Sequence, residues 1–359
     1  MSEIKVVKAA SLKEKPDVSK IGFGTHFTDH MFVMDYEEGK GWFDPRIVPY
    51  EDIKVSPANT TLHYGQAIFE GCKAYRYKGG KAVVFRAKDH VARLNRSAKI
   101  LDIPQVDEKL VYDALMKLID LEKDWIPDGP GQSLYIRPFI FSTDPFLGVS
   151  VGQYYKLMII LSPVGAYYAN GFAPVKIMVE DTYVRAAKGG LGAAKTPANY
   201  AASLHGGLIA HEKGYDQTLW TDAVNHHDIG EVGSMNILFK IDGKVVTPAL
   251  DGTILDGITR RTVLAVCKEW GVPTEERKVT IDELIEAYNN GKLEEVFGSG
   301  TAAVISPVSV LGYEGVDRVI SGGKIGPFAQ KLYDYIDGLH TGEVEDKHGF
   351  IDVAGEYWE

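Results

Sequence analysis

The segment Lys188-Gly-Gly-Leu-Gly-Ala-Ala-Lys-Thr-Pro-Ala-Asn-Tyr200 is the most unusual stretch of this sequence. It places one lysine, Lys195, among glycines and alanines. A lysine on a protein surface needs no small neighbours, whereas a lysine that carries a flat ring does, because bulky side chains would block the ring. Three interpretations follow: a glycine-rich turn with an exposed lysine, a phosphate-binding P-loop, or a lysine that forms a Schiff base with a carbonyl compound.

The P-loop interpretation rests on Gly189-x-x-x-x-Ala194-Lys195-Thr196, which differs from that motif by one residue. The second glycine of the motif lets the backbone wrap around phosphates, and here its place is taken by Ala194. The segment is also not tightly joined to the strand expected before it. A P-loop ATPase is therefore the best rival from another class, and Ala194 is the feature against it. The Schiff-base interpretation needs partner residues elsewhere in the chain.

Composition limits the classes of protein that this chain can belong to. A length of 359 residues predicts two domains, and a formal charge of −10 argues against a nucleic-acid-binding surface. The two cysteines, Cys72 and Cys267, form no C-x-x-C pair, so neither a disulfide framework nor a cysteine metal site is expected. The N-terminus lacks the apolar segment of a signal peptide, and no run approaches the roughly 18 apolar residues of a membrane helix. We therefore expect a cytoplasmic protein without a membrane partner.

The order of the expected elements predicts an α+β fold, because strands and helices do not alternate regularly. Turn formers without a helical period, at Pro163-Val-Gly-Ala-Tyr-Tyr-Ala-Asn-Gly-Phe172, indicate a linker at 164–174 between domains 1–163 and 175–359. The expected strands are 73–77 with 81–86, 134–141, 156–162, 175–180, and 237–241 with 244–247. The expected helices are one capped by Asp89, 108–123, one following Tyr200, 257–270, one after the capping box Thr280-x-x-Glu283, and 327–339.

A Schiff-base lysine for pyridoxal phosphate (PLP) would have companions, because this cofactor makes further demands on a protein. Its phosphate needs a cation or a helix N-terminus, its pyridine nitrogen needs a carboxylate, and its phenolic oxygen needs a hydrogen bond. The candidates are Ile258 and Thr259 at the start of an expected helix, the small loop Gly298–Ala302, Glu231 among small and apolar residues, and Tyr200. Each has an ordinary structural alternative, such as a capped helix, a turn, a surface glutamate or a core tyrosine.

At these residues the sequence resembles the branched-chain aminotransferases of PLP fold type IV. The matching segments, in chain order, are Leu62–Gly71, Val84–Leu94, Leu134–Pro138, Asp144–Val149, Gly192–Ala201, Glu231–Asn236, Leu255–Arg260 and Phe297–Ala302. The resemblance implies a smaller α/β N-terminal domain, a larger C-terminal pseudo-barrel domain, PLP as cofactor and a homodimer. It also implies that Asp144–Val149 belongs to a loop that completes the active site of the partner subunit.

The resemblance assigns roles residue by residue. Lys195 would be the Schiff-base lysine and the general base. The other implied cofactor-binding residues are Arg93, Ile258, Thr259 and Thr301 at the phosphate, Glu231 at the pyridine nitrogen, Tyr200 at the phenolic oxygen, and Ser234, where mammalian members have threonine. The implied substrate-binding residues are Tyr64, Phe69, Tyr135, Arg137, Tyr167, Thr301 and Ala302. Ala303 and Ser306 stand where some mammalian members carry a redox C-x-x-C, so thiol regulation is not expected there.

The implied reaction is the reversible transfer of an amino group from L-leucine, L-isoleucine or L-valine to 2-oxoglutarate by a ping-pong mechanism. The pocket must accept both an aliphatic side chain and the γ-carboxylate of glutamate, and Arg137 is the expected partner of that carboxylate. D-amino acid aminotransferases and aminodeoxychorismate lyases share the fold, but Tyr135-Ile-Arg-Pro138 and Glu231-Val-Gly-Ser-Met-Asn236 favour the branched-chain function. A metal site at His226, His227 and Glu231 is not expected, because adjacent histidines on a strand point in different directions.

Overall fold

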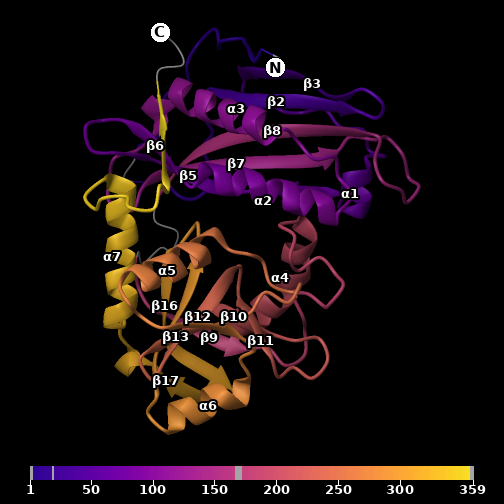
Figure 1. Cartoon of the computed structure of the whole chain (residues 1–359). Helices are drawn as coiled ribbons and strands as arrows, with labels where there is room; N and C mark the ends of the chain where they lie inside the picture. Colours follow the sequence, from indigo (N-terminus) through magenta and orange to yellow (C-terminus); the bar gives the residue numbers. More distant parts are fainter. Residues whose placement is uncertain (1–2, 18–19, 166–171, 356–359) are drawn as a thin grey trace. The chain divides into compact units, whose positions relative to one another are not determined.

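The computed structural model describes residues 3–17, 20–165 and 172–355 (Figure 1). Contacts divide the chain into two compact units. The first consists of Met1–Ala169, Ala194–Pro197 and Asp337–Glu359, and the second of Asn170–Ala193 and Ala198–Ile336. The sequence placed 194–197 and 337–359 in the second domain, whereas their contacts assign them to the first unit. Residues 166–171 of the expected linker lie outside the described residues.

The first unit is built on a nine-stranded sheet in the order β1-β3-β2-β8-β7-β5-β6-β18, with β4 paired to β7. Its strands are β1 (Lys5–Val6), β2 (His30–Glu37), β3 (Gly41–Pro49), β4 (Ala67–Phe69), β5 (Cys72–Arg76), β6 (Ala82–Phe85), β7 (Ser133–Ser142), β8 (Tyr154–Val164) and β18 (Ile351–Ala354). The expected hairpin is confirmed as β5 and β6, and the two expected apolar strands are confirmed as β7 and β8. Strand β18 returns from the C-terminal end of the chain and pairs antiparallel with β6.

The helices of the first unit are α1 (Thr60–Tyr64), α2 (Ala87–Ile100), α3 (Glu108–Leu121) and the short η2 (Lys123–Trp125). Helices α2 and α3 supply apolar side chains to the same buried core as the sheet. The expectation that Asp89 caps α2 is wrong, because the helix begins at Ala87. The N–H of Ala87 donates instead to the carboxylate of Asp352 on β18 at 3.0 Å, and Asp89 accepts a hydrogen bond from Arg86.

The second unit contains a nine-stranded sheet in the order β11-β10-β9-β16-β15-β12-β13-β14, with β17 paired to β16. Its strands are β9 (Val175–Val179), β10 (Gln217–Thr221), β11 (Ile229–Val232), β12 (Met235–Ile241), β13 (Lys244–Pro248), β14 (Thr274–Arg277), β15 (Leu293–Gly300), β16 (Val304–Tyr313) and β17 (Val316–Val319). Pairing of β11 with β12 closes β9, β10, β11, β12, β15 and β16 into a ring. This ring is the expected pseudo-barrel.

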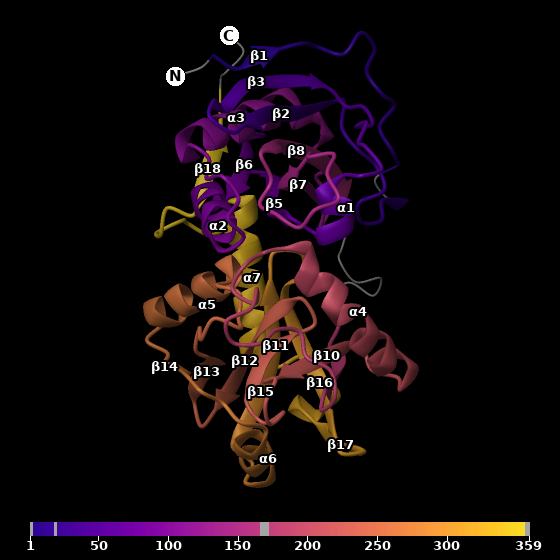
Figure 2. The same cartoon turned by 90° about the vertical axis from the view of Figure 1, so that its right-hand side faces the viewer.

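The remaining helices are α4 (Pro197–Glu212), α5 (Ile258–Glu269), α6 (Ile281–Asn289), the short η3 (Ser321–Gly323) and α7 (Pro327–Thr341). Figure 2 shows α5 and α4 on either side of the strands of the second unit. Helix α4 begins earlier than expected, at Pro197, a residue favoured in the first turn of a helix. Thr280 caps α6 as expected, since its hydroxyl accepts a hydrogen bond from the N–H of Glu283 at 3.2 Å, while the Glu283 carboxylate contacts Arg277. Among the described residues, no helix combines the length and apolar character needed to cross a bilayer.

Candidate active site

Lys195 lies in the first unit, two residues before α4, and buried groups fix its backbone on both sides. Its N–H donates to the hydroxyl of Ser97 at 2.9 Å, and its carbonyl accepts from the N–H of Phe69 at 3.0 Å. The hydroxyl of Thr196 donates to the carbonyl of Ala67 at 2.8 Å. Since Ser97 and Thr196 are fully buried and Lys195 is half-buried, this lysine is not the exposed lysine of a solvent-facing turn.

Three of the expected substrate-binding residues gather around Lys195 in the first unit. Phe69 is paired with Phe139 in the β4–β7 ladder, and Tyr135 and Arg137 lie at alternate positions of β7 from Phe139. Alternate residues of a strand share a face, so these side chains project from the same side of the sheet. The Lys195 Nζ lies 4.9 Å and the Arg137 guanidinium 4.7 Å from the centre of the Phe69 ring.

The Arg137 guanidinium is oriented by its neighbours but retains a donor. Its Nη2 donates to the Tyr135 hydroxyl at 3.2 Å, and its centre lies 5.3 Å from the Tyr135 ring. Within the described residues, its Nε is buried and has no hydrogen-bond partner. A buried donor without a partner is rare in proteins, and an acceptor on a bound ligand is one way to satisfy it. A carboxylate is the acceptor that the planar guanidinium binds best.

Tyr64, which was also assigned to the substrate, is not part of this group. Tyr64 ends α1, is 45% exposed, and donates its hydroxyl hydrogen to the carbonyl of Leu147. Its described partner therefore belongs to Asp144–Val149, the loop expected to serve a partner subunit. Tyr167 lies outside the described residues.

Arg93 on α2 forms a buried ion pair with Glu70, a residue that the sequence reasoning did not single out. The Arg93 Nε and Nη2 lie 2.7 and 2.9 Å from the two carboxylate oxygens of Glu70. The Nδ1 of His90, one turn earlier on α2, lies 2.7 Å from the same carboxylate. Burial alone would raise the pKa of Glu70, but the charge and hydrogen bonds of Arg93, together with His90, hold it well below its usual range.

The second unit holds Glu231 with a buried carboxylate that receives three donors. The Arg185 Nε lies 2.8 Å from Oε2, and Oε1 accepts from Asn236 Nδ2 at 3.1 Å and from the N–H of Leu255 at 3.0 Å. Donors of this kind, one of them charged, stabilise the ionised carboxylate. Arg185 also donates to the carbonyl of Thr253 at 3.0 Å. Arg185 and Asn236 are further residues whose part in the site the sequence reasoning missed.

The start of α5 has the character of an anion site. Ile258 and Thr259 are buried in its first turn, and the preceding residue, Gly257, offers no side chain as a cap. The first N–H groups of a helix point outward along its axis and attract anions such as phosphate. Asn236 contacts the Glu231 carboxylate and also lies against Gly257, the residue before α5. Glu231 on β11 and Asn236 on β12 are therefore close to the helix start that suits a phosphate.

Thr301 and Ala302 lie half-buried in the turn between β15 and β16. Val304, which follows that turn, has a φ of +63°, a left-handed conformation that β-branched residues rarely adopt. Strain of this kind persists only where surrounding structure enforces it, which fixes the direction of the turn. Tyr200 is half-buried in the first turn of α4, and Ser234 is exposed in the turn between β11 and β12.

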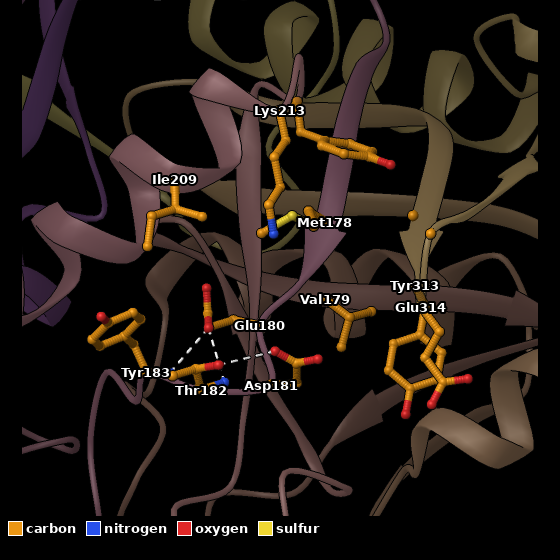
Figure 3. A pocket seen from close by; sticks show the side chains of 13 residues that line it. Met178, Val179, Glu180, Asp181, Thr182, Tyr183, Ile209, Lys213, Tyr313 and Glu314 are labelled. Carbon is orange, nitrogen blue, oxygen red and sulfur yellow. Dashed lines mark hydrogen bonds between the residues drawn. The ribbon is translucent and has the colours of Figure 1, made fainter.

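The cavity in Figure 3, of about 490 Å³, contains none of the expected site residues. Its wall includes Glu180, whose Oε1 accepts hydrogen bonds from the N–H groups of Thr182 and Tyr183, so this carboxylate organises the local turn. The histidines of the metal alternative also have separate partners: His227 contacts Asp282 and His226 contacts Thr221. Among the described residues, no group of three or more His, Cys, Asp or Glu side chains is arranged to hold a metal ion.

Comparison with known proteins places this arrangement in a family. The model of the family described as amino-transferase class IV matches residues 67–311, more than half of the chain. The chain belongs to the class IV aminotransferases. A relative from Bacillus subtilis (strain 168), branched-chain-amino-acid aminotransferase 2, is 52% identical over 347 residues, which cover 97% of this chain and 96% of the relative. The expected family is thereby confirmed.

Solved structures of class IV aminotransferases share the fold. The branched-chain amino acid aminotransferase of Escherichia coli superposes with a TM-score of 0.75 and 31% identity, covering 90% of this chain and 99% of that chain. A branched-chain amino acid aminotransferase from T.th., solved with pyridoxamine 5'-phosphate, gives a TM-score of 0.73 and 27% identity, covering 90% of this chain and 98% of that one. The expected fold class is confirmed.

The family and the structure solved with pyridoxamine 5'-phosphate imply pyridoxal phosphate as cofactor, and the residues of this class IV aminotransferase fit it. The first unit contains a half-buried lysine held by its backbone and a buried arginine. The second unit contains a buried carboxylate and a helix start without a side-chain cap. Groups of these kinds are what the aldehyde, the phosphate and the protonated pyridine nitrogen require.

Proposed function

We propose that this protein catalyses the reversible transfer of the amino group of L-leucine, L-isoleucine or L-valine to 2-oxoglutarate, with PLP held on Lys195. The observation that carries the proposal is the group of Lys195, Phe69, Tyr135 and Arg137 on one face of the first sheet. In this group the aromatic rings of Phe69 and Tyr135, which suit an aliphatic substrate side chain, lie near Arg137, and the Phe69 ring also lies near the Lys195 amine. Among the described residues, the Arg137 Nε has no hydrogen-bond partner. The name of the Bacillus subtilis relative supports the branched-chain substrate.

Each end of the cofactor has a residue set suited to it. Lys195 and Arg93 of the first unit would hold the aldehyde and the phosphate. In the second unit, the assigned residues are Glu231 for the pyridine nitrogen, Tyr200 for the phenolic oxygen, Ser234, and Ile258, Thr259 and Thr301 for the phosphate. When bound, the cofactor supplies an electron sink that stabilises negative charge at the substrate α-carbon. The three donors on Glu231 support its role, because they keep a negative charge where the ring nitrogen must remain protonated.

Lys195 is the proposed general base. Its Nζ would accept the proton of the substrate α-carbon and hold it for return, while the cofactor, when bound, would take up the electron pair. The Phe69 ring beneath Nζ restricts the approach of water from that side. The hydrogen bond from the Lys195 N–H to Ser97 and the one from the Phe69 N–H to the Lys195 carbonyl fix the backbone, so the side chain alone would move.

The test of this function is the visible absorbance spectrum of the purified holoprotein. Addition of L-leucine is expected to remove the long-wavelength cofactor band, and 2-oxoglutarate is expected to restore it, as a ping-pong transfer requires. If the cofactor band does not change with leucine but changes with D-alanine, the proposed role of Lys195 would stand and the branched-chain substrate would be wrong. The absence of any band after incubation with PLP would overturn the proposed function.

Replacement of Arg137 by alanine is expected to lower kcat/KM for glutamate more than kcat/KM for leucine. The γ-carboxylate of glutamate loses a charge-assisted hydrogen bond, which lowers kcat/KM for glutamate by about 10- to 100-fold, whereas leucine loses only packing. Measurement of both half-reactions on the same preparation separates the two effects. Equal losses for both substrates would contradict this division of roles.

We also propose that the protein works as a homodimer. Phe146, Leu147 and Val149, in the loop between β7 and β8, are 54%, 61% and 83% exposed. Several large apolar side chains exposed together indicate an interaction surface. Leu147→Asp is expected to shift the molecular mass in solution from dimer to monomer and to lower leucine turnover. A wild-type protein that is monomeric at micromolar concentration would contradict the proposal.

A further inference from the structure

Asn236 is the buried last residue of the segment Glu231–Asn236, and the proposed function gives it no role. It lies on β12 directly opposite Glu231 on β11. Its Nδ2 donates to Glu231 Oε1 at 3.1 Å and to the carbonyl of Leu255 at 2.9 Å. Both amide hydrogens are therefore used, and both acceptors belong to residues next to the proposed cofactor site.

The orientation of the Asn236 amide follows from these partners. A flipped amide would turn its oxygen toward a carboxylate and a carbonyl, which are acceptors only. In the observed orientation, Oδ1 packs against Gly257, where an ideal Cβ would lie 1.8 Å from that oxygen. Aspartate at position 236 would offer no donors, and leucine would offer neither donors nor acceptor. The position thus requires an amide of this length.

The contacts of Asn236 close a small ring of hydrogen bonds. Leu255 donates its N–H to the same oxygen of Glu231 that Asn236 contacts, and its carbonyl accepts from Asn236. Leu255 precedes α5 by three residues, with Gly257 immediately before the first turn. The carboxylate assigned to the pyridine nitrogen and the helix start assigned to the phosphate are consequently joined through one side chain.

We propose that Asn236 is a positioning residue that fixes Glu231 relative to the N-terminus of α5, so that both ends of PLP bind at once. The inference rests on the proposed function and deepens it by naming the residue that couples the two ends. The flat ring and the short CH2–O link to the phosphate limit the distance that PLP can span, so a change in the spacing of the two protein groups weakens simultaneous contact with both. A ligand that uses only one end does not depend on that spacing.

This dependence on ligand length distinguishes positioning from a general contribution to stability. Apo-protein of wild type and Asn236→Ala is titrated with PLP, with pyridoxal and with inorganic phosphate. For the variant we expect affinity for PLP to fall about 10- to 100-fold, while affinities for pyridoxal and phosphate change by no more than about threefold. Equal losses for all three ligands would overturn the proposal, as would unchanged PLP binding.

A double-variant cycle with Glu231→Gln provides the second readout. If Asn236 acts through Glu231, the double variant should lose less PLP affinity than the product of the two single losses. Additive losses would overturn the inference. If Asn236→Ala does not fold, Asn236→Leu is used in the same cycle, because it fills similar space and removes the donors without adding a charge beside Glu231.

Thr247→Val is the matched control. Thr247 is equally buried on the neighbouring strand β13 and donates to the backbone carbonyl of Ile237 at 2.8 Å, so its loss removes one buried hydrogen bond outside the proposed site. PLP affinity should remain that of the wild type. If the wild-type apo-protein binds no PLP, the proposed function itself is wrong. That outcome differs from a failure of the Asn236 proposal alone, in which the wild type still binds PLP.

Discussion

With alanine in place of Lys195, kcat/KM for L-leucine is expected to fall by at least about 10⁴-fold. A positioned general base alone contributes roughly 10²- to 10⁴-fold, and the covalent attachment of the cofactor is lost as well. The fold should be little affected, because the hydrogen bonds of Lys195 with Ser97 and Phe69 use its backbone N–H and carbonyl, which alanine retains. The measurement is single-turnover conversion of the cofactor with L-leucine, followed by thermal unfolding of the apo-protein.

The matched control for this substitution is Lys188→Ala. Lys188 belongs to the same glycine-rich segment but is exposed. Its variant should transaminate at the wild-type rate. Small primary amines added to Lys195→Ala should restore part of the rate, because they supply the missing base in solution. Turnover of Lys195→Ala within tenfold of wild type would show that another residue moves the proton.

Among the described residues, local signals predicted six of the seven α-helices but only seven of the 18 strands. Asp242-Gly243 adopts the two positive φ angles, +50° and +76°, that a tight hairpin between β12 and β13 requires. Thr280 caps α6 as its spacing to Glu283 indicated. The start of α2 was mispredicted because its cap is not local. Asp352 reaches Ala87 only after β18 has joined the sheet, and no pattern near Ala87 reports that pairing.

In the candidate site, too, some residues could be recognised from the local sequence, whereas others are brought in only by the fold. Lys195 and Glu231 stand in segments whose composition is unusual enough to be noticed, whereas Arg93 was assigned only through the family resemblance. Their partners are chosen by the fold: Arg185 reaches Glu231 from a different loop. Glu70 carried a weak signal, a carboxylate inside the apolar run Ala67–Gly71, which predicts a buried partner of opposite charge. Nothing in the sequence identified that partner as Arg93.

Loss of the Glu70 carboxylate is expected to produce the largest change in stability. In Glu70→Ala the guanidinium of Arg93 remains buried without its partner, which costs about 3–5 kcal/mol in the free energy of unfolding. Urea unfolding of the apo-protein measures this difference. Glu70→Gln should cost less, because the amide keeps the shape and one acceptor for Arg93. A loss in Glu70→Ala below about 1 kcal/mol, the range of an exposed pair, would contradict the burial of this ion pair.

The difference in the free energy of unfolding between wild type and Glu70→Gln should depend on pH in a definite direction. Despite burial, Arg93 and His90 hold the pKa of Glu70 well below its usual range, whereas in the unfolded chain it is about 4.3. A carboxyl group whose pKa is lower in the folded state contributes stability above its unfolded pKa and loses it as the pH falls. The contribution of the Glu70 charge to the stability difference between wild type and Glu70→Gln should therefore be fully present above about pH 5 and narrow below about pH 4. His90 adds a separate change below its unfolded pKa of about 6.5, because burial lowers its folded pKa and Glu70 raises it.

Stability and cofactor binding can be separated at this pair. Replacing a buried ion pair by apolar side chains of similar volume is often neutral for stability, since both desolvation costs disappear together. The double variant Glu70→Leu, Arg93→Leu should consequently recover most of the stability lost in Glu70→Ala. It should still bind PLP far more weakly than wild type, because the cation for the phosphate is absent. Wild-type PLP affinity in this stable double variant would mean that Arg93 serves the fold alone and that the N-terminus of α5 suffices for the phosphate.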